Sequence, residues 1–188
     1  ARQAGFDLSI YDQYSEQTRN ELKAAAIIYA MNNIRSAFEG VAARKLSEIK
    51  QGVYVICLSH PFTIKYAKTC SEIVYIGRGN INGRLKSHFE KSLFRLMRGL
   101  SGTNFDFYLT EPVHTASDAY FKHIEYLLLK RFSDTIGGGK LPILNTNAGS
   151  KQDIVTVGAG WEKPLKATGK KPLWALETTK HWDFEKLG

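Results

Sequence analysis

The sequence predicts an α+β fold, because strand-like and helix-like patterns alternate through the middle of the chain. Three runs rich in β-branched and aromatic residues, at 52–58, 72–76 and 105–110, predict strands. Two segments with apolar residues at helical spacing, at 83–98 and 118–132, predict helices with one buried face. The resulting order of elements is strand, strand, helix, strand, helix.

Length and charge divide the chain into three parts, 1–49, 50–150 and 151–188. The 188 residues suffice for one domain with a real core plus extensions at both ends. The net charge is +8, and the middle part carries 13 basic against 7 acidic side chains, while the first part is balanced. A local basic field predicts a polyanionic partner such as nucleic acid, although a merely soluble basic protein would show the same balance.

The N-terminal part is predicted to be a helical extension. Thr18 and Glu21 have the spacing of a capping box. The Ala-rich run at 22–38 contains no Gly or Pro and predicts a helix that stops at Gly40, followed by a short helix at 41–50. We expect this pair of helices to be a packing element for the following domain, and a docking or dimerisation surface is the alternative.

The first strand, 52–58, is an apolar run in which Cys57 is expected to be a small buried residue. Residues 62–66 could extend this strand or the next one. With only Cys57 and Cys70, the chain cannot build a tetrahedral zinc site from thiols alone, and we expect a cytoplasmic protein, with one disulfide as the alternative. No apolar run approaches the ~20 residues of a membrane span and no signal peptide is visible, so we expect no membrane partner.

A glycine-rich turn between Gly77 and Gly83 joins the second strand to a basic helix. Arg84 and His88 are four residues apart, so a helix places both on one face. The apolar stripe of this helix consists of Leu85, Phe89, Leu93 and Leu96, and its basic row of Arg84, His88, Lys91 and Arg95. A turn that directs an Arg and a His to one point predicts a phosphate site, and a solvated helix face is the alternative.

Two later features complete the pattern. Glu125 lies at the edge of the apolar face of the helix at 118–132, so its carboxylate is not fully in water. The last part of the chain has possible strands at 153–157 and 173–178, and it also holds Trp161, Trp174, Trp182, Lys163, Lys166, Lys170 and Lys171. These lysines could neutralise phosphates and the tryptophans could stack on bases, or the tryptophans fill a small core.

Three short motifs now converge: Gly52-Val53-Tyr54, Tyr75-Ile76-Gly77 and Arg84-x-x-x-His88. Together with the helical Glu125 and with Asn145 in a Pro-x-Leu-Asn sequence, this set resembles the GIY-YIG nuclease family over about residues 50–147. Val53 stands where the family name has Ile, and the spacer between the two tripeptides is longer than is usual in the family.

The resemblance implies a small three-stranded antiparallel sheet flanked by helices, with the parts outside 50–150 as extensions. It also implies a Mg²⁺- or Mn²⁺-dependent endonuclease that cleaves DNA to leave 5′-phosphate and 3′-hydroxyl ends. Glu125 would be the one protein ligand of the metal ion. A single hard oxygen ligand suits a Mg²⁺ that keeps several waters.

The resemblance further implies a role for each remaining site residue. Tyr54 would activate the attacking water and Tyr75 would orient water or phosphate. Arg84 would stabilise the charge that develops at phosphorus, because a guanidinium is always protonated and binds phosphate in a fork. His88 would share the role of base, or hold Tyr54 or the phosphate. Arg78 is expected to contact a phosphate.

Asn145 is expected to form a hydrogen bond within the site, contribute to substrate binding and help to position the helix that carries Glu125. Read singly, each site residue also fits an ordinary structural role, and only their joint order favours catalysis. A non-cleaving nucleic-acid-binding module and an RNA-cleaving nuclease are the alternatives. Among DNA-cleaving roles, a stand-alone nuclease of restriction or homing type is favoured, with a homodimer where both strands are cut.

Overall fold

The computed structural model describes residues 8–100, 103–111, 118–152, 157, 159–166 and 171–177. The chain divides into two compact units. The first unit combines residues 1–50 with residues 80–103, and the second combines residues 51–79 with residues 104–188. None of the helices in the described ranges has both the length and the apolar composition that a membrane span requires.

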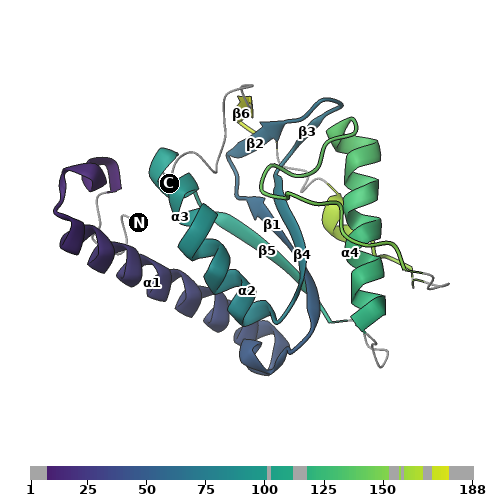
Figure 1. The fold of residues 1–188 in the computed structure, drawn as a ribbon, viewed down its shortest axis with the longest axis horizontal. Helices are drawn as coiled ribbons and strands as arrows, with labels where there is room; N and C mark the ends of the chain where they lie inside the picture. The colour runs from purple at the N-terminus through teal and green to yellow at the C-terminus, as the bar shows by residue number, and fades with distance from the viewer. Residues whose placement is uncertain are drawn as a thin grey trace. The chain divides into compact units, whose positions relative to one another are not determined.

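The described elements of the first unit are helical: η2 (Leu8–Gln13), α1 (Glu16–Ala42), η3 (Leu46–Glu48), α2 (Ile81–His88), η4 (Phe89–Leu93) and α3 (Phe94–Gly99). The long helix α1 runs beside the α2–α3 segment (Figure 1). Arg35 Nε donates a hydrogen bond to Asn82 Oδ1 at 3.0 Å and so ties α1 to α2. Tyr11 packs edge-on against Phe94, with ring centroids 5.4 Å apart.

The N-terminal helix differs from the expectation of two helices separated at Gly40. A single helix, α1, continues through Gly40 and ends where Ala43 adopts a left-handed conformation with φ 53°. A glycine inside a helix costs about 1 kcal/mol relative to alanine but does not oblige the helix to stop. The expected capping box is also displaced, because the cap is Ser15, whose hydroxyl accepts from the backbone N–H of Thr18.

The basic helix expected at 83–98 is present as a continuous helical segment, but it is not regular. Its N-cap is Asn80, whose side chain accepts from the backbone N–H of Gly83 at 3.0 Å. A π turn, η4, separates α2 from α3. Because a π turn contains one residue more than an α turn, side chains after it are rotated relative to Arg84 and His88.

The second unit contains a three-stranded antiparallel sheet in the order β4-β1-β5. Its strands are β1 (Gly52–Leu58), β4 (Ile73–Gly79) and β5 (Phe105–Thr110). All three lie where the sequence predicts strands, and β4 extends three residues further than expected. The α+β class and the antiparallel sheet are therefore confirmed.

One face of this sheet is covered by α4 (Asp118–Phe132), as Figure 1 shows. Every residue of the central strand β1 is buried, which explains its continuous apolar sequence. Val53, Val55 and Cys57 point to the helix and pack with a cluster that includes Phe121, Ile124, Leu128 and Phe132. Side chains alternate along a strand, so Tyr54 points to the opposite face. The expected burial of Cys57 is confirmed.

A second small sheet has the order β3-β2-β6, with β2 (Phe62–Lys65), β3 (Cys70–Ser71) and β6 (Trp174–Glu177). Residues 62–65 thus form a strand of their own rather than extending a neighbour. The strand expected at 173–178 is β6, which pairs in parallel with β2. Residues 153–156, Lys170 and Trp182 lie outside the described residues.

Two short turns close the second unit, the π turn η5 (Ser133–Gly137) after α4 and the 3-10 turn η6 (Lys163–Leu165). Trp161 and Leu165 pack partly buried against the cluster beneath α4, so this tryptophan contributes to a core. Trp174 is 62% exposed, and its role as a base-stacking side chain stays a prediction.

Candidate functional site

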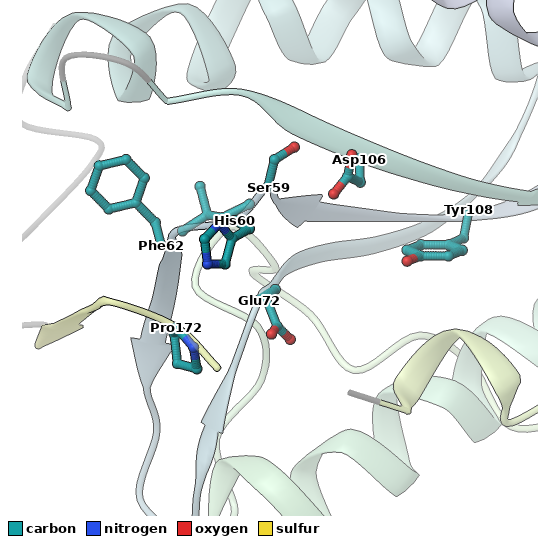
Figure 2. Close-up of a pocket in the computed structure, with 8 residues that line it drawn as sticks. Ser59, His60, Phe62, Glu72, Asp106, Tyr108 and Pro172 are labelled. Atoms are coloured by element: carbon teal, nitrogen blue, oxygen red, sulfur yellow. The ribbon is translucent and has the colours of Figure 1, made fainter. Parts of the chain in front are cut away.

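A cavity of about 480 Å³ lies in the second unit, and its lining includes His60, Phe62, Glu72, Asp106 and Tyr108 (Figure 2). It contains none of the residues that the sequence singled out. Burial raises the pKa of the Tyr108 hydroxyl, and the charges of Asp106 and Glu72 raise it further. Because no residue of the expected nuclease site lines this cavity, the cavity is a separate feature of the second unit.

The tyrosines of the two tripeptide motifs meet on the sheet face opposite α4. Tyr54 is the register partner of Gly77 across β1 and β4, and Tyr75 lies two residues before Gly77, so all three share one face. The rings are stacked, with centroids 5.8 Å apart and planes inclined by 27°. The sequence cannot give this proximity, because it depends on the register between two strands.

Gly77 makes this arrangement possible. A Cβ atom at this position would lie 2.4 Å from Cε1 of Tyr75, 2.9 Å from Oη of Tyr54 and 3.0 Å from Oη of Tyr75. No real side chain fits so close to these atoms, so the glycine leaves the space into which both hydroxyls point. Tyr54 is 0% exposed and Tyr75 is partly buried. The Tyr54 hydroxyl therefore acts only through groups that contact it.

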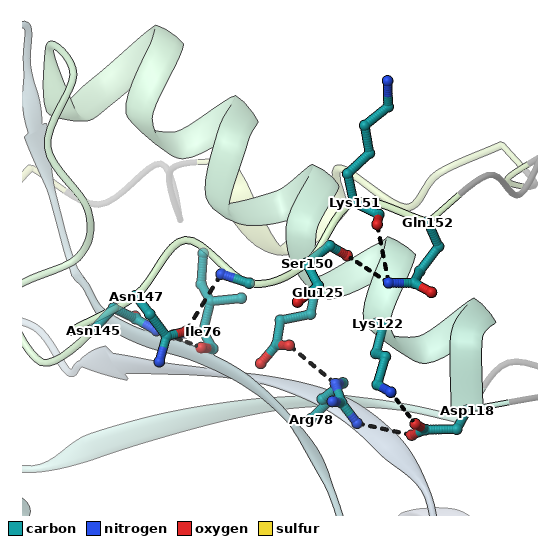
Figure 3. Close-up of polar contacts among 11 residues, drawn as sticks. Ile76, Arg78, Asp118, Lys122, Glu125, Asn145, Asn147, Ser150, Lys151 and Gln152 are labelled. Atoms are coloured by element: carbon teal, nitrogen blue, oxygen red, sulfur yellow. Dashed lines mark hydrogen bonds and ion pairs between the residues drawn. The ribbon is translucent and has the colours of Figure 1, made fainter.

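Arg78 follows Gly77 and points to the opposite face, toward α4. Its Nε donates to Oε2 of Glu125 at 3.1 Å, and its Nη1 donates to Oδ1 of Asp118 at 2.9 Å (Figure 3). Lys122 Nζ lies 2.7 Å from Oδ2 of Asp118. The side chains of Arg78 and Glu125 are 26% and 16% exposed, so the ion pair is partly shielded from water. Arg78 and Glu125 were both predicted from the sequence as site residues, but the ion pair between them was not predicted.

Asp118 and Lys122 are the residues that the sequence reading missed. With Glu125 they occupy positions i, i+4 and i+7 of α4, and this spacing places all three on one helix face. The hydrogen bond from Lys122, together with the charge of Arg78, holds the pKa of the Asp118 carboxyl below its usual range. The helical spacing was readable in the sequence, but the contacts of Arg78 with Asp118 and Glu125 were not.

Asn145 binds the backbone of Ile76, the residue between Tyr75 and Gly77. Its Oδ1 accepts from the N–H of Ile76 at 2.9 Å, and its Nδ2 donates to the carbonyl of Ile76 at 2.8 Å. Figure 3 shows the side chain beside this strand. Both the oxygen and the nitrogen of the Asn145 amide are thus hydrogen-bonded to the backbone of β4. A direct contact of Asn145 with substrate stays a prediction, and it would require these bonds to open.

Arg84 and His88 lie on α2 in the first unit. Arg84 is exposed and His88 is partly buried. Burial of the imidazole, with the positive charges of Arg84 and Lys91 beside it, lowers the pKa of His88 from 6.5 to about 4. His88 is therefore neutral near pH 7 and can accept a proton or a hydrogen bond. The meeting of Arg84 and His88 with the tyrosines and Glu125 stays a prediction.

In the described part of the chain, no three His, Cys, Asp or Glu side chains gather into a metal-binding group. Among the predicted site residues, Glu125 supplies the carboxylate, a hard oxygen ligand for a metal ion. This donor fits a Mg²⁺ ion that takes its other ligands from water and from substrate phosphate. The pairing of Oε2 with Arg78 means that a cation would have to share or displace this contact.

The second unit thus holds two groups of predicted residues on the two faces of the sheet: Tyr54 with Tyr75 on the face opposite α4, and Arg78 with Glu125 on the face that α4 covers. Asn145 lies on the backbone between them. Comparisons of the chain with protein-family models, with curated proteins and with solved structures return no match. Function therefore has to be inferred from these residues and their chemistry.

Proposed function

We propose that the chain is a Mg²⁺-dependent endonuclease of the GIY-YIG type that hydrolyses phosphodiester bonds in DNA. The observation that carries this proposal is the convergence of the Tyr54 and Tyr75 hydroxyls over Gly77. Any residue with a side chain at position 77 would force the two tyrosine rings to move, because its Cβ would collide with them. A site that needs both phenolic hydroxyls at one point therefore requires glycine at this position.

The two hydroxyls supply the acid–base part of the chemistry. Tyr75, partly buried, orients the attacking water or a phosphate oxygen through its hydroxyl. Tyr54, once its own phenolic proton has passed to a neighbouring base, takes the proton of that water through a group that contacts its buried oxygen, as the water oxygen attacks phosphorus. His88, neutral near pH 7, is the further proton acceptor. The glycine-rich turn and the first residues of α2 connect β4, which carries Tyr75, to His88.

Charge stabilisation falls to Arg84 and Glu125. The guanidinium of Arg84 binds the phosphate oxygens in a fork and stabilises the charge that builds up at phosphorus. Glu125 would hold the metal ion, and the chemistry that such an ion supplies is the neutralisation of phosphate charge and the stabilisation of the leaving oxygen. Arg78 lies beside Glu125, and when its Nε leaves the carboxylate it contacts a neighbouring phosphate while its Nη1 stays on Asp118.

DNA as substrate is supported by charge. The part from 50 to 150 carries 13 basic and 7 acidic side chains. Binding to a phosphate backbone through such an excess releases counterions and weakens as salt rises. The proposed role is that of a stand-alone nuclease of restriction or homing type, in which two copies act together where both strands are cut.

The experiment that tests the proposal compares substrates and metal in one assay. Supercoiled plasmid, single-stranded DNA, branched DNA and RNA are incubated with the chain in Mg²⁺ and in EDTA. We expect nicked or linear plasmid in Mg²⁺ and intact plasmid in EDTA. Binding of DNA without any cleavage in Mg²⁺ would instead favour a non-cleaving module, and cleavage of RNA alone would replace DNA as the substrate.

A further inference from the structure

The contacts of Arg78 point to a control on the metal site. One guanidinium lies between two carboxylates of the same helix, Glu125 on its Nε and Asp118 on its Nη1. Glu125 is the more buried of the two, with 16% of its side chain exposed against 47% for Asp118. Arg78 therefore occupies Oε2, one of the two carboxylate oxygens that Glu125 could offer to a cation.

An arginine in this position cannot withdraw by losing its proton, because its pKa is too high. It leaves the Glu125 carboxylate only by moving. Asp118 already holds Nη1 at 2.9 Å, and this contact can persist when the Nε contact with Glu125 opens. Lys122, 2.7 Å from the second oxygen of Asp118, keeps that carboxylate in place.

We propose that Asp118 is a positioning residue that draws Arg78 away from Glu125, and that Arg78 competes with the divalent metal ion for the Glu125 carboxylate. This inference rests on the proposed function, because it takes Glu125 to be the metal ligand. Without substrate, the Arg78–Glu125 ion pair blocks metal binding at Glu125. The contact of Arg78 with Asp118 determines how readily that ion pair opens.

The test measures Mn²⁺ binding to the full chain without DNA, by the loss of the free Mn²⁺ signal in electron paramagnetic resonance. Arg78→Gln should bind Mn²⁺ several-fold more tightly, because the competing guanidinium is gone. Asp118→Asn should bind about tenfold more weakly, since Arg78 then rests on Glu125 alone. Asp118→Glu should restore the affinity.

A double variant separates this mechanism from a simple effect of charge. If Asp118 acts through Arg78, Asp118→Asn has no effect on Mn²⁺ affinity in the Arg78→Gln background. If it acts only by its negative field, the same loss appears in both backgrounds, and that result overturns the proposal. Asp134→Asn is the matched control, because Asp134 is also an exposed Asp paired with a Lys four residues away, and it should leave affinity unchanged.

Two further readouts keep the outcomes distinct. Asp118→Asn should raise the Mg²⁺ concentration for half-maximal cleavage while leaving the maximal rate nearly unchanged, and circular dichroism should show an unaltered fold. Glu125→Gln should lose Mn²⁺ binding. Unchanged binding in Glu125→Gln overturns the metal role in the proposed function, and the competition with it. Lost binding in Glu125→Gln with no tightening in Arg78→Gln overturns the competition alone.

Discussion

Tyr54 and Tyr75 stack with their ring centroids 5.8 Å apart, and both hydroxyl oxygens lie within 3.0 Å of the position that a Cβ atom would take at Gly77. Neither residue is unusual in a strand by itself. What distinguishes them is that both phenolic oxygens approach the same point on one face of the sheet. Cleavage should therefore depend on both hydroxyls and on the glycine beneath them.

Removing either hydroxyl should slow cleavage without disturbing the fold. Tyr54→Phe and Tyr75→Phe keep the rings and their stacking, so the fold should be retained, with a loss of at most about 1–3 kcal/mol in the free energy of unfolding from the lost hydroxyl contacts. The single-turnover rate of plasmid nicking should fall about 10²–10⁴-fold, the usual contribution of a positioned acid or base. Tyr29→Phe on α1 is the control, and an equal loss of rate in this variant would contradict a specific role for the pair.

Gly77→Ala should displace both rings. The new methyl group would lie 2.4 Å from Cε1 of Tyr75, so the variant should lose about 1–3 kcal/mol in the free energy of unfolding and most of its activity. Gly40→Ala is the opposite control. Apart from the neighbouring residues and the backbone of α1 itself, no atom lies within 4 Å of a Cβ at Gly40, so alanine should stabilise this helix by about 0.5–1 kcal/mol. Urea unfolding measures both changes.

His88 should make the protein less stable in acid. Its pKa is lowered to about 4 in the folded chain, while the unfolded chain keeps a value near 6.5. Between these two values the unfolded state binds more protons, so stability is retained above pH 6.5 and is lost as the pH falls toward 4. His88→Gln should reduce this loss by on the order of 1–3 kcal/mol. The free energy of unfolding of the unaltered chain and of His88→Gln is measured in urea at pH 7 and at pH 4.5. An equal change in this free energy between the two pH values for both proteins would refute the burial of a neutral imidazole.

Asn145→Ala should weaken the edge of β4. The variant leaves the N–H and carbonyl of Ile76 without the two bonds that Asn145 forms, which should cost about 1–3 kcal/mol. Asn147→Ala, which removes one 3.3 Å contact in an exposed loop, should cost much less. If cleavage falls far more than stability in Asn145→Ala, the amide also contacts substrate.

The strands and the helix α4 could be predicted because their patterns are local. The run at 52–58 is continuously apolar because β1 is buried on both faces, and 105–110 alternates because β5 is half-exposed. The end of α1 could not be predicted. Gly40 is the obvious stop, but nothing in the local sequence shows that the helix continues to Ala42 and that Ala43 adopts φ 53°.

The residues of the candidate site could be predicted from the sequence, but the contacts between them could not. The order of motifs identified Tyr54, Tyr75, Arg78 and Glu125. The stacking of the tyrosines depends on the register of β1 with β4, and the pairing of Arg78 with Glu125 depends on how α4 lies on that sheet. Both are long-range properties, since they follow from the packing of segments distant in sequence.

The most direct measurement is the nicking of supercoiled plasmid in Mg²⁺ by the unaltered chain and by Glu125→Gln. Loss of the metal ligand should remove several kcal/mol of transition-state stabilisation, so the rate should fall at least ~10²-fold. Glu90→Gln, an exposed carboxylate paired with Lys86, should cut at the original rate. Wild-type cleavage by Glu125→Gln, or cleavage by the unaltered chain that persists in EDTA, would contradict a metal-dependent nuclease built around this carboxylate.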